Sequence, residues 1–161
     1  MDANRFWGSN LVQVHLVVQA ALQMSNNLYS SRYHIACKRN NSGGYDYVQV
    51  FVERLGGILD SYQTVGLSRQ SIIAFDRRML LGHLPFYLLK QRLSNSGNQK
   101  ANAFILRSRY KNLLIFWIFL MPIVVMPRFI AIIWGALSTL IGRVFYGDFL
   151  RGFYFLINKI R

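Results

Sequence analysis

The stretch LLIFWIFLMPIVVMPRFIAIIWGALSTLIG, residues 113–142, decides what kind of fold this chain has. Its single charged residue, Arg128, separates two uncharged runs, Leu113–Pro127 and Phe129–Gly142. Each run is shorter than the roughly 20 residues that a bilayer-spanning helix needs, whereas the two joined exceed that length. The stretch therefore predicts apolar helices that associate with a membrane.

Three membrane geometries fit this stretch. A single tilted span would bury Arg128 near the bilayer centre, at a cost of about 2.5 to 3.5 kcal/mol on insertion scales. A re-entrant hairpin turned at Pro122 and Pro127 would keep both basic flanks on the cytoplasmic side. An interfacial pair would lie flat while its arginines snorkel to the headgroups. Prolines five residues apart are poor partners for one straight span, so they favour the hairpin or the interfacial pair.

Charge follows the same division of the chain. The net charge is +13, and residues 1–76 hold six Lys/Arg against five Asp/Glu, whereas residues 77–161 hold thirteen Lys/Arg against Asp148 alone. A half that is both basic and apolar favours anionic lipid headgroups as a partner. Nucleic acid is excluded as a partner, because the cations are interleaved with apolar residues and no nucleic-acid-binding motif occurs. Residues Asp148–Arg161 are predicted to form a basic amphipathic helix on the membrane surface.

The first part of the chain predicts helices and one strand. A helix capped by Ser9 or Asn10 runs to about residue 25, with His15, Gln19 and Gln23 on one face and a buried apolar remainder. Residues 28–37 predict a strand, followed by the loop 38–45.

Two further helices are expected before a linker. Asp46 and Gln49 form a capping-box pattern that opens a helix over residues 46–62. Ser68 caps another helix, which Pro85 interrupts. Residues 94–99, SNSGNQ, are small and polar and predict a linker.

Most standard sites of chemistry are missing from the sequence. Cys37 is the only cysteine, which excludes an intrachain disulfide. The histidines His15, His34 and His83 are too scattered to predict a metal site, and Asp76 is expected to be a solvated helix charge. The loop KRNNSGGY, Lys38–Tyr45, could gather backbone N–H groups and cations around a diphosphate or a sugar, although a plain connection would suit the same residues.

A family resemblance favours the binding loop. The order WGSNLVQ, an apolar helix, RNNSGGYDYVQVF, a helix and LPFYLLKQR resembles the C-terminal half of family 2 glycosyltransferases of the abequosyltransferase type, which act in O-antigen and capsule assembly. The likeness spans about residues 5–92. It implies an α/β, helix-rich fold, the acceptor half of a GT-A fold, followed by membrane-associated apolar helices.

The resemblance also implies roles for particular residues. An acceptor-side group would comprise Trp7, Gly8, Ser9, Asn10, Gln13 and His15. A loop near the donor diphosphate would comprise Arg39, Asn40, Asn41, Gly43, Gly44 and Tyr45. The Asp-x-Asp motif of the donor half does not occur in this sequence, so no cofactor is expected here, and Mg or Mn would come only with that half. The catalytic residues stay unknown.

Two function hypotheses result. The first is the C-terminal part of a glycosyltransferase that moves a sugar from a nucleotide-sugar to a polyprenyl-diphosphate-linked acceptor, at the cytoplasmic face of the inner membrane. Its expected organisation is residues 1–93 as the acceptor side, 94–99 as a linker and 100–161 as a membrane-associated tail. The alternative is a small non-enzymatic basic membrane protein that binds anionic lipid or a partner protein.

Overall fold

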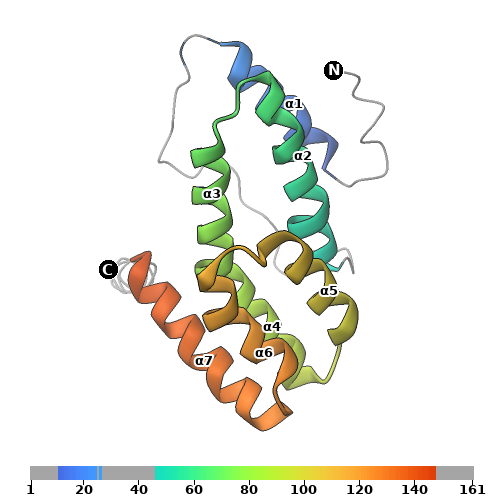
Figure 1. The fold of residues 1–161 in the computed structure, drawn as a ribbon, viewed down its shortest axis with the longest axis vertical. Coiled ribbons are helices and arrows are strands. Elements are labelled where there is room, and N and C mark those ends of the chain that lie inside the picture. Colours follow the sequence, from blue (N-terminus) through green and yellow to red (C-terminus); the bar gives the residue numbers. More distant parts are fainter. Residues whose placement is uncertain (1–10, 25, 27–45, 148–161) are drawn as a thin grey trace, which may run out of the picture. The chain divides into compact units, whose positions relative to one another are not determined.

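A computed structural model describes residues 11–24, 26 and 46–147, and the regular structure of these residues is helical (Figure 1). Helices make up 84% of the described residues, which contain no strand. The predicted α/β, GT-A-like fold class is therefore wrong. Along most of the described segments, apolar side chains recur at helical spacing, so they bury one stripe of a helix instead of one face of a sheet. The strand predicted at residues 28–37 lies outside the described residues.

The chain divides into two compact units, Met1–Arg69 and Gln70–Arg161. The described elements of the first are α1 (Val12–Gln23), the π-helical segment η2 (Val48–Arg54), α2 (Leu55–Ser61) and the 3-10 turn η3 (Tyr62–Val65). Those of the second are α3 (Arg69–Arg78), apart from its first residue, and η4 (Met79–His83), α4 (Leu84–Ser94), α5 (Gln99–Tyr110), η5 (Phe116–Leu120), α6 (Met121–Val125) and α7 (Arg128–Phe145).

The helix predicted over residues 46–62 is confirmed at its start. The carboxylate oxygen Oδ1 of Asp46 accepts the backbone N–H groups of Val48 at 2.8 Å and Gln49 at 3.2 Å. It thereby satisfies two donors that have no partner inside the first turn. The wider π-helical turn then lets Val48, Val50 and Val52 all lie in the core.

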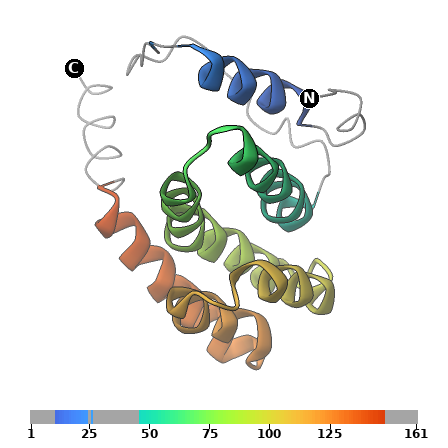
Figure 2. The ribbon, with the colours of Figure 1, turned by 45° about the horizontal axis from the view of Figure 1, so that its top comes forward.

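In the second unit, the helical segments alternate in direction (Figures 1 and 2). The α3–η4–α4 rod runs one way, α5 returns, η5–α6 runs with the rod, and α7 packs antiparallel against α4 and α6. Of the predicted linker 94–99, residues 95–98 form the turn between α4 and α5 inside this unit, whereas Ser94 ends α4 and Gln99 begins α5. Asn95 there has a left-handed φ of 51°, and Asn98 caps α5 by accepting the N–H of Ala101 at 3.1 Å.

Neither Pro85 nor Pro122 ends a helix, contrary to expectation. Both lie in the first turn of a regular helix, α4 or α6, directly after a π-helical segment, η4 or η5. The π turn gives the proline ring room beside the preceding turn, where a regular α-helix would clash. Within residues 113–142, the chain reverses only at Met126 and Pro127, where Met126 is extended with φ −75° and ψ 159°. The apolar stretch is thus a helical hairpin.

Candidate functional site: the outer surface of α7 and its basic ends

The predicted acceptor and donor residues can be followed only in part. Trp7, Gly8, Ser9 and Asn10 lie outside the described residues, as do the loop residues Arg39, Asn40, Asn41, Gly43, Gly44 and Tyr45. Gln13 and His15 both lie on α1, but Gln13 is exposed whereas His15 is fully buried. Residues two apart on a helix point to opposite sides. The structure therefore does not bring these two side chains together.

His15 joins α1 to η3 inside the first unit. The Tyr62 hydroxyl donates to the backbone oxygen of His15 at 3.1 Å and lies 2.8 Å from the ring nitrogen Nδ1. Burial raises the pKa of Tyr62 above its ordinary value, so this hydroxyl stays protonated. This contact turns the polar face of α1 inward, and Leu16 and Val17 are exposed. The prediction of a buried apolar remainder was wrong.

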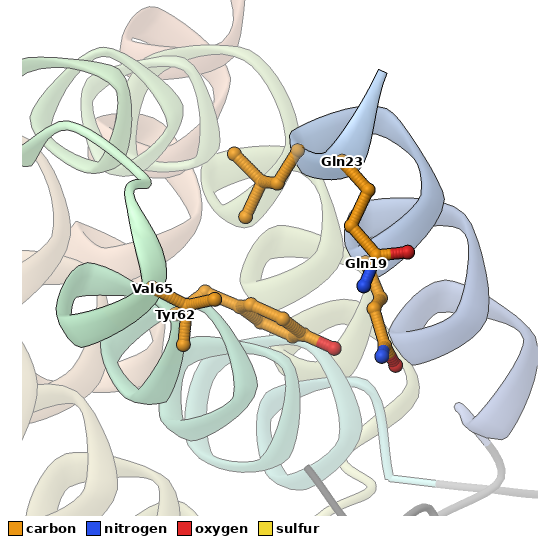
Figure 3. Close-up of a pocket in the computed structure, with 5 residues that line it drawn as sticks. Gln19, Gln23, Tyr62 and Val65 are labelled. Carbon is orange, nitrogen blue, oxygen red and sulfur yellow. The ribbon is translucent and has the colours of Figure 1, made fainter.

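Beside Tyr62 lies an open cavity of about 170 Å³, which Gln19, Leu22, Gln23 and Val65 also line (Figure 3). Gln19 and Gln23 face the same tyrosine as His15, as the four-residue spacing predicts. The cavity thus has two amide groups and a phenol ring around a largely apolar hollow. This combination has no nucleophile and no acid–base pair.

The long helix α7 buries small residues and exposes large apolar ones, the reverse of the usual arrangement in a soluble protein. Its buried residues are small: Ala131, Gly135, Ser138 and Gly142. Its exposed residues include large apolar ones: Phe129, Ile130, Ile133, Trp134, Leu137, Leu140, Ile141, Val144 and Phe145. Small residues between helices and large apolar residues on the outside are the pattern of helices that pack within lipid. The small residues recur at spacings of four, three and four in the sequence, a signal of this interface that sequence reasoning missed.

Two glycines set how closely α7 approaches the α3–η4–α4 rod. A Cβ at Gly142 would lie 1.8 Å from the backbone oxygen of Leu81, and a Cβ at Gly135 would lie 3.2 Å from the Cβ of Leu89. Leu81 lies four residues before Pro85, and proline has no backbone N–H. The Leu81 carbonyl therefore lacks the donor that an α-helix would place at position 85. The absent side chain of Gly142 thus makes room for this carbonyl.

The other two prolines free carbonyls that receive side-chain donors from neighbouring helices. The indole Nε1 of Trp134 donates to the oxygen of Ile118 at 2.9 Å, four residues before Pro122. Arg92 Nε donates to the oxygen of Ile123 at 2.7 Å, four residues before Pro127. Ser138 adds a bond from α7 to the oxygen of Phe119 at 3.3 Å. Neighbouring helices satisfy proline-freed backbone groups in this way in membrane proteins, where no water can do so.

Arg92 and Arg128 each donate to backbone carbonyls at the C-terminal end of a neighbouring helix. Arg92 on α4 donates to the oxygens of Ile123 and Val124 at the end of α6. Arg128 at the start of α7 donates to the oxygens of Arg92, at 3.1 Å, and Leu93, at 2.8 Å, at the end of α4. Guanidinium groups at helix C-termini meet carbonyls without helical partners and the negative end of the dipole. Arg128 therefore has backbone partners within the protein.

Asp76, the expected solvated charge, is instead buried at the other end of the unit. Its carboxylate holds Arg109 through two hydrogen bonds, from Nε at 3.0 Å and Nη2 at 3.2 Å, and so joins α3 to α5. Burial, followed by the negative charge of Asp76, raises the pKa of the neighbouring Tyr110 well above its ordinary value. Asp76 is the only acid among the described residues of the second unit, so the described part of this unit offers its other cations no second carboxylate.

No family model, curated protein or solved structure matches this chain. Among the described residues, no group of three His, Cys, Asp or Glu side chains could hold a metal ion. One described helix, α7, is long and apolar enough to cross a membrane by its length and composition. Its 18 residues extend beyond the uncharged run that the sequence delimits and span about 27 Å, close to the ~30 Å of a bilayer's hydrocarbon core.

Proposed function

We propose that the second unit is a membrane anchor, in which the hairpin of η5–α6 and α7 inserts into the bilayer. The packing of α7 carries this proposal. Only 28% of the 18-residue window is buried inside the protein, although the window is strongly apolar. A core helix of a soluble protein would turn its large apolar residues inward, because their burial is the main stabilising term in water. On α7 these residues face outward, where lipid would cover them.

The backbone bonds of the hairpin support the same proposal. Insertion requires the carbonyls freed by Pro122 and Pro127 to find partners within the protein. Trp134 and Arg92 supply those partners. Arg128, the one charge inside the apolar stretch, donates to the carbonyls that end α4, which lowers the cost of placing it near lipid.

The distribution of cations supports insertion from the cytoplasmic side of the inner membrane. One end of the unit carries these described cations: Arg77, Arg78, Arg107, Arg109, Lys111 and Arg143. The opposite end carries Lys90, Arg92, Lys100 and Arg128, and two of these cap helices. Excess Lys and Arg flanking membrane helices stay on the cytoplasmic side. We therefore assign the Arg78–Arg143 end to the cytoplasmic headgroups.

A charge on the outer face of α7 is the direct test of insertion. Leu137→Lys is expected to reduce the share of full-length chain that stays with the membrane after alkaline carbonate washing by tenfold or more, since a lysine in hydrocarbon costs about 2.5 to 3.5 kcal/mol. The matched control is Val65→Lys on η3, because Val65 is 49% exposed and Leu137 is 48% exposed. Equal retention of both variants would contradict the proposal.

Sugar transfer is a second proposal, which rests on the resemblance of the WGSN and RNNSGGY segments to family 2 glycosyltransferases. An anchor in the cytoplasmic leaflet would suit it, because polyprenyl-diphosphate acceptors lie in that leaflet. Nucleotide-sugar titration of the full chain, alone and joined to its upstream coding region, tests it. Binding that Arg39→Ala weakens would support the proposal, and absence of binding in both forms would refute it.

A further inference from the structure

Two arginines lie over aromatic rings where the α3–η4–α4 rod crosses the end of α7. The guanidinium carbon of Arg78 is 4.8 Å from the ring centre of Tyr146, and that of Arg143 is 5.2 Å from the ring centre of Phe86. A Cβ at Gly82, midway in sequence between positions 78 and 86, would lie 3.7 Å from the Tyr146 ring. The close packing of Tyr146 on Gly82 thus brings the two arginine–aromatic pairs to one crossing.

The charges of this crossing are uncompensated within the described residues. Asp76, the only described acid of the unit, is held by Arg109 through both carboxylate oxygens. Arg78 and Arg143 are both exposed. An aromatic ring beneath a guanidinium fixes the orientation of the guanidinium plane. The N–H groups at the edge of that plane stay available, and they match the oxygens of a phosphate.

The position of the crossing favours a lipid phosphate over a soluble one. Arg143 ends the uncharged run of α7, and the exposed apolar residues Leu140, Ile141 and Val144 adjoin it. Tyrosine is enriched at the level of the headgroups, where one end of the side chain meets lipid and the other meets water. The site therefore combines an apolar surface for acyl chains with cations at the level of the phosphates.

We infer that Arg78, Arg143 and Tyr146 form a binding site for the phosphate of an anionic phospholipid. The inference rests on the proposed insertion of the second unit, and it names the lipid class that this unit selects. By contrast, Arg92 and Arg128 at the opposite end already bind backbone carbonyls. We assign the preference for anionic lipid to the Arg78–Arg143 end, because two arginines and a tyrosine meet there beside the apolar surface of α7.

Vesicle binding by the full chain tests this inference. Binding is measured to phosphatidylcholine vesicles and to vesicles with part of that lipid replaced by phosphatidylglycerol. The double variant Arg78→Gln/Arg143→Gln is expected to lose about fivefold in affinity for each arginine on the anionic vesicles, and little on the neutral ones. The control Arg69→Gln/Lys100→Gln removes the same charge from two exposed positions outside the crossing. Equal losses in the two double variants would overturn the site in favour of general charge attraction.

Two further readouts separate the possible failures. Quenching of tryptophan fluorescence by brominated acyl chains reports insertion itself. Its absence in the unmodified chain would refute the membrane anchor, whereas quenching without a phosphatidylglycerol preference would refute only the lipid site. Inorganic phosphate at constant ionic strength should not release the protein, and release would assign the site to free phosphate. The charge-conserving variant Arg78→Lys/Arg143→Lys should keep part of the preference for phosphatidylglycerol vesicles. If this variant still inserts but loses as much of that preference as Arg78→Gln/Arg143→Gln, a role for charge is overturned.

Discussion

Gly142→Ala is expected to destabilise the packing of α7 on the α3–η4–α4 rod by more than a usual small-to-large substitution. A Cβ would lie 1.8 Å from the oxygen of Leu81, far inside van der Waals contact. The obstructing atom belongs to the backbone, so rotation of a side chain cannot relieve the overlap. Overpacking of a core costs about 1–3 kcal/mol where neighbours can adjust. We expect a loss at or above the top of that range, measured by unfolding of the full chain in detergent micelles.

The matched control for Gly142→Ala is the same substitution at Gly57. Gly57 also lies within a helix, α2, but a Cβ there would meet no atom within 4 Å. Alanine favours a helix over glycine by about 0.5–1 kcal/mol, so Gly57→Ala should stabilise the chain slightly. The two substitutions should therefore have opposite signs. A Gly142→Ala protein as stable as the unmodified chain would show that α7 does not pack on Leu81.

Asp76→Asn is expected to be the most damaging single charge change in the described residues. The side chains of Asp76 and Arg109 are only 12% and 13% exposed, so loss of the carboxylate leaves a largely buried guanidinium without its anion. Breaking a buried ion pair from one side costs about 3–5 kcal/mol. The charge change should therefore separate α3 from α5, and the unfolding free energy should fall accordingly.

A double-mutant cycle isolates the Asp76–Arg109 interaction. Arg109→Met alone leaves the carboxylate buried without its partner, whereas Asp76→Asn/Arg109→Met removes both charges. The double variant should lose less stability than the sum of the single losses. Glu53→Gln, on an exposed acid of the first unit, is the control and should change stability by less than about 0.5 kcal/mol. Additive single losses would show that the two residues do not act as a pair.

Several features of the fold follow from local sequence. Asp46 begins a helix as its capping pattern predicts, because the accepting oxygen and the donors lie within three residues of one another. The polar face of α1 follows from a four-residue spacing. Residues 113–142 form helices that reverse at Met126 and Pro127, as one of the two prolines named for a turn predicts, whereas the choice between a re-entrant hairpin and an interfacial pair stays a prediction. Such features depend on neighbours in the chain and need no knowledge of distant residues.

The candidate site shows where local reasoning stops. Local reasoning predicted breaks at Pro85 and Pro122, but it did not predict the π-helical turns that accommodate these prolines. It identified Asp76 as a helix charge but not its burial against Arg109, 33 residues away. The α/β expectation came from the resemblance and from the strand predicted at residues 28–37, which lie outside the described residues, and the described residues are helical.

The sequence by itself determined that residues 113–142 form apolar helices and that their flanks are basic, because hydropathy and charge are summed along the chain. Tertiary structure alone decided which carbonyls Arg92, Arg128 and Trp134 bind, because those carbonyls belong to other helices. The hydropathy of α7 did not reveal its packing face, because large apolar residues and small residues are both uncharged. Side-chain volume selects that face instead, since only the small residues of α7 admit the backbone of the neighbouring rod.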